Sequence, residues 1–274
     1  QTPRDLGFNT GSALSSVNYN DTGWGVTDFH WKQLFKGDAR DSLLVGHMDP
    51  GEWADQHILR NSWTNLINDA FYNNPTVAIP KRGFGVVGRA VLPRRWYVAA
   101  GFHDANGKGN ELDFRQVWDT GEAFTWVEAG ILRKEGAPFG RSTHLNYWHQ
   151  DARNEAGTEA SYGFAFSTSR KFDNGIIGVI RAGYSEGDAP QMREFLGLAT
   201  SFPMRGSDRL KVGIGWGSPP DNTLRSQTTV EILYRLQLTQ NMTISPDLQV
   251  TFNPSFNEQK EIVYIPGLRF RYNF

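Results

Sequence analysis

The sequence contains no cysteine, and this absence excludes several kinds of site. Thiolate nucleophiles, zinc sites with cysteine ligands and disulfide bonds are all ruled out. The sequence also lacks any run of about 18 apolar residues, which a membrane-spanning helix would need. Neither sign of charge dominates, because 28 Lys and Arg residues are balanced by 29 Asp and Glu residues. A formal net charge of −1 argues against a nucleic-acid partner.

Recognised enzyme and metal motifs are missing as well. The six histidines show no HExxH or paired-ligand spacing, and no GxSxG stretch occurs. We therefore expect no enzymatic activity, no bound metal and no cofactor.

The residues that are present combine many aromatic side chains with a polar average. Aromatic residues make up 13% of the chain and glycine occurs 29 times, yet the mean hydropathy is −0.50. This combination disfavours a helical membrane protein. It suits a transmembrane β-barrel, because such strands alternate between lipid-facing and lumen-facing residues.

An alternation of period two runs along most of the chain and is clearest at its end. Between positions 262 and 274 the even residues are apolar or aromatic, whereas Arg269 and Arg271 occupy odd positions. This pattern is typical of a strand between lipid and water. The same alternation occurs at 227–238 and 242–252. Further strand-like segments lie near 24–35, 42–48, 83–91, 95–103, 124–133, 142–149, 160–168, 176–184, 193–203 and 209–217, with a weaker candidate near 9–19.

The lengths of the connections support the same fold. If the chain ends in the periplasm, the connections that fall outside, such as 49–82 and 104–123, are systematically longer than the periplasmic turns, such as 92–94 and 239–241. Bacterial barrels show this asymmetry. We therefore predict one domain over residues 1–274, an all-β transmembrane antiparallel barrel. It has about 14 strands in this chain, or about 16 if an N-terminal hairpin is missing.

One segment departs from the strand period. Residues 53–72 place apolar side chains at helical spacing, at Ile58, Leu59, Leu66, Ile67, Ala70 and Phe71. The segment lies inside the longest outside loop, 49–82, and a long loop with its own structure is usually functional. We predict that this loop contains a helix and folds into the pore. A helical cap on the rim is the alternative.

Several stretches make the sequence similar to a known family. They are VGHMDPGEWAD, AFYNNPTVAIPKRGFGVV, WYVAAGFHDANG and the closing YRLQLTQNMTISPDLQVTFNPSFNEQKEIVYIPGLRFRYNF, which cover most of residues 42–110 and 227–274. The chain resembles the carbohydrate-selective porin (OprB) family of Gram-negative outer membranes, although the middle of the chain matches only in texture. The resemblance implies passive diffusion of mono- or oligosaccharides, with small sugars, outer-membrane lipid and lipopolysaccharide as partners. It also allows a homo-oligomer, and family members are usually longer at the N-terminus.

A sugar channel needs a lumen that suits neutral, hydroxyl-rich solutes with apolar ring faces. Aromatic side chains fit the ring faces, and arginine, carboxylate and amide groups fit the hydroxyls. On the loop, the candidate pore-lining residues are Trp53, Asp55, Arg60, Asn61, Trp63, Asn65, Asp69 and Arg82. On the polar faces of the strands they are Arg89, Glu128, Arg181, Glu231, Arg235, Asp247, Arg269 and Arg271. Most of these wall charges are expected to pair with one another.

Five aromatic residues near strand ends suit the interfacial girdle of a barrel better than its pore. They are Trp96, Tyr97, Trp126, Trp148 and Trp216.

Two alternative functions stay open. The many lumen-side arginines fit a porin for other small solutes, such as organic anions or acidic sugars. A weaker alternative is an outer-membrane barrel hydrolase, because Ser142, His144 and Asn146 share one face of a predicted strand.

Overall fold

The computed structural model describes residues 26, 28–35, 41–109, 111–257 and 259–273. They form one antiparallel sheet in which thirteen strands pair in sequence order. The strands are β1 (Phe29–Phe35), β2 (Asp41–Met48), β3 (Gly83–Val91), β4 (Trp96–Asp104), β5 (Ala123–Leu132), β6 (Ser142–Gln150), β7 (Ser161–Lys171), β8 (Ile177–Glu186), β9 (Glu194–Pro203), β10 (Arg209–Ser218), β11 (Gln227–Gln237), β12 (Met242–Phe252) and β13 (Ile262–Tyr272). Each corresponds to a predicted strand. The weak candidate near 9–19 lies outside the described residues.

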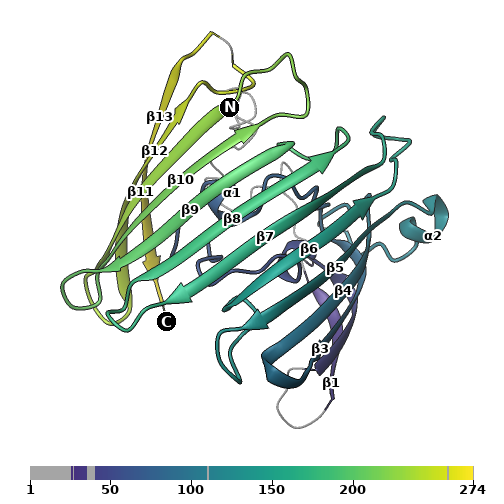
Figure 1. Ribbon diagram of the computed structural model, residues 1–274, viewed down its shortest axis with the longest axis horizontal. Coiled ribbons are helices and arrows are strands. Elements are labelled where there is room, and N and C mark those ends of the chain that lie inside the picture. Colours follow the sequence, from purple (N-terminus) through teal and green to yellow (C-terminus); the bar gives the residue numbers. More distant parts are fainter. Residues whose placement is uncertain (1–25, 27, 36–40, 110, 258, 274) are drawn as a thin grey trace.

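The sheet curls, so that it has a convex outer face and a concave inner face (Figure 1). Within the described part of the chain, no pairing joins β1 to β13. The helical segments are short: η2 (Pro50–Glu52), α1 (Asp69–Tyr72), η3 (Pro93–Arg95) and α2 (Gln116–Thr120). None of these described helices has the length and apolar character needed to span a membrane. The predicted difference between long and short connections is confirmed, and the short turns lie on the side that bacterial barrels direct to the periplasm.

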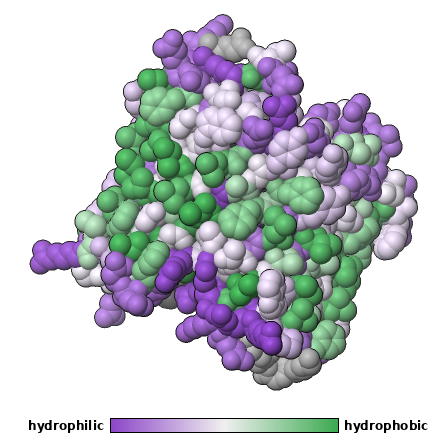
Figure 2. Space-filling view, viewed as in Figure 1, coloured by the Kyte–Doolittle hydropathy of each residue, from purple (hydrophilic) through white to green (hydrophobic). Residues whose placement is uncertain are grey.

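Burial in the sheet is the reverse of that in a soluble protein. On β12 every second residue is polar and buried on the inner face: Thr243, Ser245, Asp247, Gln249 and Thr251. Between them, Leu248 and Phe252 are exposed on the outer face. Figure 2 shows the resulting hydrophobic belt across the strands, bordered by hydrophilic surface. The outer face therefore suits lipid, and the buried polar groups of the inner face require hydrogen-bond partners.

The girdle prediction is correct for only two of its five residues. Trp96 and Trp216 are exposed on the outer face. The other three, Tyr97, Trp126 and Trp148, are fully buried on the inner face, so their assignment to the girdle was wrong. The strand period gives the reason, because Trp126 lies two residues from the inward-facing Glu128. There its indole stacks on the imidazole of His103, with the ring centroids 6.5 Å apart.

The predicted helix over residues 53–72 forms only as the single turn α1. A helix needs each backbone amide to bond a carbonyl four residues earlier. Here the amides of Asp55 and Ile67 instead bond carboxylates of the sheet, and Asp55 adopts a φ of 49°. Asn61 closes a separate turn, because its side-chain oxygen accepts from the amide of Trp63 at 3.0 Å. The apolar residues that suggested a helix pack instead against the inner face of the sheet.

Candidate pore and its inner loop

Residues 49–82, which connect β2 to β3, lie against the inner face of the sheet, and we call them the inner loop. Its apolar residues Leu59, Leu66, Ala70 and Phe71 form one buried cluster with Val179, Phe195, Ala199 and Leu233 of the strands. The wall leaves room for them at Gly213, where a Cβ would lie 2.8 Å from both Leu66 and Phe71. The prediction that the loop folds inward is thus confirmed, and the rim cap is excluded.

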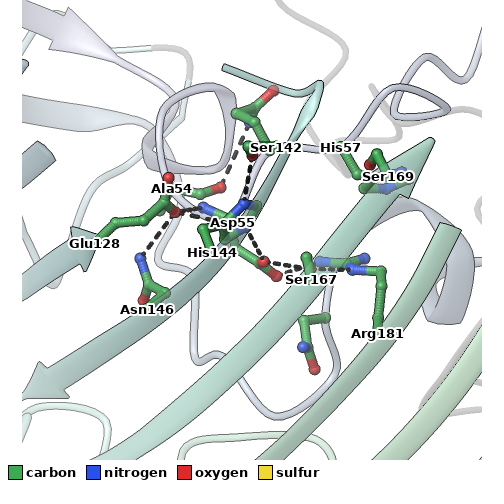
Figure 3. Close-up of polar contacts among 12 residues, drawn as sticks. Ala54, Asp55, His57, Glu128, Ser142, His144, Asn146, Ser167, Ser169 and Arg181 are labelled. Atoms are coloured by element: carbon green, nitrogen blue, oxygen red, sulfur yellow. Dashed lines mark hydrogen bonds and ion pairs between the residues drawn. The ribbon is translucent and has the colours of Figure 1, made fainter. Parts of the chain in front are cut away.

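Asp55 forms the first polar anchor of the inner loop (Figure 3). Its carboxylate accepts a hydrogen bond from the Ser167 hydroxyl at 2.6 Å, lies 2.9 Å from Nε2 of His144, and pairs with the Arg181 guanidinium. The side chains of Asp55 and Arg181 are only 2% and 4% exposed. Burial by itself would raise the pKa of Asp55. The charge of Arg181 and the hydrogen bond from His144 outweigh burial and hold that pKa well below its usual range.

Glu128 and Arg89 hold the residues on either side of this anchor. One carboxylate oxygen of Glu128 accepts from the Asp55 amide at 2.9 Å, and the other accepts from the Tyr97 hydroxyl at 2.7 Å. The Arg89 guanidinium donates to the Trp53 carbonyl and lies 5.1 Å from the centre of the Trp53 ring. Glu128 and Arg89 therefore bind the inner loop with their side chains.

Glu231 forms a second anchor, at the start of α1. Its two carboxylate oxygens accept from the backbone amides of Ile67 and Asn68, both at 2.8 Å. Amides at the start of a helix have no carbonyl partner within the helix, so a carboxylate there satisfies them. The side-chain amide of Asn68 also donates to Gln249 at 2.8 Å. Two neighbouring strands, β11 and β12, thus fix the same turn.

Two cations hold the middle of the loop. Arg269 donates to the carbonyls of Ser62 at 2.5 Å and Asn65 at 2.8 Å, and it lies 3.6 Å from the Asp247 carboxylate. The Lys211 ammonium donates to the side-chain oxygen of Asn65 at 2.6 Å. Sequence reasoning missed Lys211. The alternation along β10 could have identified it, because Lys211 lies two residues before Gly213 and so falls on the inner face, opposite the apolar outer residues.

The Ser142 and His144 pair belongs to the Asp55 anchor. Ser142 Oγ lies 2.8 Å from His144 Nδ1, so that serine, histidine and aspartate form a chain. However, the Ser142 hydroxyl donates its proton to the carbonyl of Phe139 at 2.6 Å. His144 must then donate to Ser142, which leaves it no free lone pair at Nδ1 for base catalysis. All three side chains are also buried. This geometry holds the loop and does not present a nucleophile.

Other candidate residues make contacts within the inner loop itself. Arg60 pairs with Glu52 at 2.7 Å and lies 4.3 Å from the centre of the Tyr72 ring. Asp69 accepts from Asn73 at 2.9 Å, and burial raises the pKa of its carboxyl. Arg82, at the end of the loop, lies 3.7 Å from the Asp49 carboxylate.

A smaller set of candidate residues stays accessible on the inner side. Trp63 follows the anchored Ser62 and is 68% exposed. Arg235 and Arg271 lie half-buried on the inner face near the periplasmic ends of β11 and β13. Arg209, which sequence reasoning missed, stands opposite Arg235 in the pairing of β10 with β11. The inner loop thus presents an exposed indole next to its contact with Arg269 of β13, and the wall formed by β10–β13 carries a strip of arginines.

The sequence model of the family described as carbohydrate-selective porin, OprB family, matches residues 111–274, which is more than half of the chain. The chain belongs to the carbohydrate-selective porin OprB family. The match includes the middle of the chain, so the expectation that this part is similar only in texture was wrong. It also includes the closing stretch, whereas the similar stretches within 42–110 lie outside the matched range. No curated protein matches this OprB-family chain.

Solved structures agree on the fold. The high-pH structure of Pseudomonas putida OprB matches with a TM-score of 0.67 at 14% identity, over 91% of this chain and 73% of the other. Its low-pH structure matches with a TM-score of 0.55 at 14% identity, over 92% and 68%. The trimer form of OmpT from Vibrio cholerae matches with a TM-score of 0.53 at 10% identity, over 85% and 76%. This OprB-family chain therefore has the fold of an outer-membrane β-barrel, and its location is the Gram-negative outer membrane.

Proposed function

We propose that this porin conducts mono- and oligosaccharides past the exposed edge of the inner loop, between Trp63 and the arginines of β10–β13. The observation that carries the proposal is the placement of Trp63. Its neighbour Ser62 is tied to Arg269 of β13, and its indole is 68% exposed although most of the loop is buried.

The chemistry of this edge suits a sugar. An exposed indole offers an apolar plane against which the apolar face of a sugar ring loses its contact with water. The guanidinium groups of Arg235 and Arg271 each supply a fixed fork of donors for neighbouring hydroxyls. Because the most buried charges hold the loop in place, the half-buried arginines are the groups left for the solute. In this proposal the protein is a passive channel with no catalytic step.

The proposal can be tested by recording single channels in a planar bilayer while titrating glucose and a maltooligosaccharide. We expect sugar to block the open channel, and we expect Trp63→Ala to weaken that block several-fold without closing the pore. Trp118→Ala is the matched control, because Trp118 is 69% exposed on α2, in another loop. An unchanged block in Trp63→Ala would rule out this sugar contact. Equal passage of sugars and amino acids of the same size would rule out sugar preference.

One observation favours a second candidate, a channel for organic anions or acidic sugars. Arg209 and Arg235 face each other across β10 and β11, and Arg271 lies on the same inner face. Several like charges on one wall raise the local concentration of anions. A reversal potential that shows strong anion selectivity, together with a current insensitive to neutral sugars, would favour this candidate.

A further inference from the structure

The short turns at the periplasmic end of β3–β8 carry a concentration of positive charge. A cavity of about 730 Å³ between the β5–β6 and β7–β8 turns is lined by Arg133, Lys134, Arg141, Arg170, Lys171 and Phe172. We call these six residues the basic pocket. Asp173 is the single acidic residue among its neighbours in the lining. Among the described contacts, none of these six residues bonds the inner loop.

The basic pocket opens on the outer face of the sheet, at the border of the hydrophobic belt. Arg133 donates to the hydroxyl of Thr143 at 2.7 Å and to that of Thr168. By the strand period, Thr143 shares the outer face with the exposed Leu145, and Thr168 shares it with the exposed Phe166. The guanidinium groups therefore stand where lipid headgroups meet the periplasm, and lipid-facing side chains lie directly beside them.

Five cations and one carboxylate, that of Asp173, line this pocket, so its positive charge is only partly balanced. Within the described residues, none of its five cations makes an ion pair with a carboxylate. Arg133 donates to neutral oxygens, including the carbonyl of Ser169 at 2.7 Å. Burial and the nearby charge of Arg170 lower the pKa of the Arg133 guanidinium. An anion bound between these groups would relieve their mutual repulsion.

The neighbouring β3–β4 turn extends the same positive surface. Arg95 donates to the Arg133 carbonyl at 2.8 Å, so the two turns are in contact. Arg94 and Arg95 both adopt left-handed backbone, with φ of 60° and 68°, in a hairpin position that normally favours asparagine and glycine. Beside them, Leu92 and Trp96 are exposed on the outer face. Two arginines in place of less strained residues, next to an interfacial tryptophan, suit contact with a membrane surface.

We propose that the basic pocket binds the phosphate of an anionic phospholipid in the inner leaflet of the outer membrane. The planar forks of Arg133, Arg141 and Arg170 match the geometry of phosphate oxygens. The Phe172 ring, 4.9 Å from the Arg170 guanidinium, supplies an apolar surface at the level where the acyl chains begin. The proposal rests on the membrane placement of the barrel and not on its sugar selectivity.

Native mass spectrometry of the full chain in detergent tests the proposal, with phosphatidylglycerol and phosphatidylethanolamine added at equal concentration. We expect preferential retention of phosphatidylglycerol. The variant Arg133→Gln/Arg141→Gln/Arg170→Gln should reduce that retention about tenfold or more, because each cation near a membrane surface contributes separately to lipid attraction. The matched control is Arg115→Gln/Arg205→Gln/Lys260→Gln, which removes three exposed cations elsewhere and should retain the lipid as the original chain does.

Three outcomes would overturn the proposal. They are equal retention of the two lipids, unchanged retention in the triple variant, and release of phosphatidylglycerol by millimolar inorganic phosphate, which would identify a site for the free ion. If the triple variant fails to fold, Arg141→Gln/Arg170→Gln leaves the hydrogen bonds of Arg133 intact and serves as the test. An intermediate retention is expected for that double variant, and full retention there would also overturn the proposal.

Discussion

Replacing Asp55 by asparagine should release the beginning of the inner loop. The change removes the charge that pairs with Arg181, whose side chain is only 4% exposed. Breaking a buried ion pair by removing one partner costs about 3–5 kcal/mol, because the remaining charge stays buried without compensation. At about 1.4 kcal/mol for each factor of ten, the ratio of released to docked loop should rise roughly 10²- to 10⁴-fold.

Two assays report this release. Limited proteolysis with trypsin should cut the folded barrel after Arg60 much faster in Asp55→Asn than in the original chain, and single channels should show more current noise. Asp221→Asn is the control, because Asp221 lies in the connection between β10 and β11 and its side chain bonds only the nearby Thr223 among the described contacts. Its cleavage rate and channel noise should not change.

A double variant tests the electrostatic reasoning directly. In Asp55→Asn/Arg181→Gln the buried guanidinium is gone, so the loop should be released less than in Asp55→Asn alone. If the two substitutions simply add, or if Asp55→Asn leaves proteolysis and noise as they were, the Asp55 and Arg181 pair does not hold the loop.

Three further predictions concern other contacts of the inner loop. Glu231→Gln replaces one of two acceptor oxygens by a donor and leaves a buried backbone amide without a partner, which should destabilise the docked loop by about 1–3 kcal/mol. The same proteolysis assay should then show faster cleavage, and unchanged cleavage would contradict this. Burial lowers the pKa of His57 well below 6.5, so the released loop binds a proton more readily than the docked loop. Acidification below about pH 6.5 should therefore favour release by up to about tenfold per pH unit, and His57→Gln should remove that dependence. A Cβ at Gly183 would lie 1.9 Å from the Thr76 hydroxyl, so Gly183→Ala should displace that end of the loop and lower the melting temperature. Gly88→Ala is the control, because a Cβ there would meet open space. Equal melting temperatures for the two variants would refute this packing argument.

The strands could be predicted from the sequence because one face of each strand meets lipid and the other meets polar groups. This constraint repeats every two residues, so it is visible along the chain, and on β12 even Pro246 keeps to the apolar outer face. The same alternation also predicts correctly that most charged side chains, including Glu231 and Asp247, lie on the inner face. The same rule places Trp126 inside, because it lies two residues from the inward-facing Glu128, although tryptophan generally favours interfaces.

The inner loop could not be predicted to the same depth. Its conformation is decided by partners distant in sequence, such as Glu128 for the Asp55 amide and Glu231 for the Ile67 amide. Local spacing indicated a helix, whereas hydrogen bonds to the wall determined the backbone. For the same reason the sequence could identify the charged candidates but could not show which of them hold the loop and which stay accessible to solute. Arg181 and Arg269 hold the loop, and only the folded chain separates them from the more accessible Arg235 and Arg271.

The anchors of the inner loop also set an order of assembly. Ser62 and Arg269 are 207 positions apart, and Asn68 and Gln249 are 181 positions apart. Contacts between such distant positions form late, because the intervening chain must first be ordered. Residues 62–68 of the loop therefore reach these partners only once β11–β13 are in place. When residues 62–68 are docked, the C-terminal strands are thus in place. In a barrel whose final strands are mispaired, this segment would be released while Asp55 still bonds β6–β8.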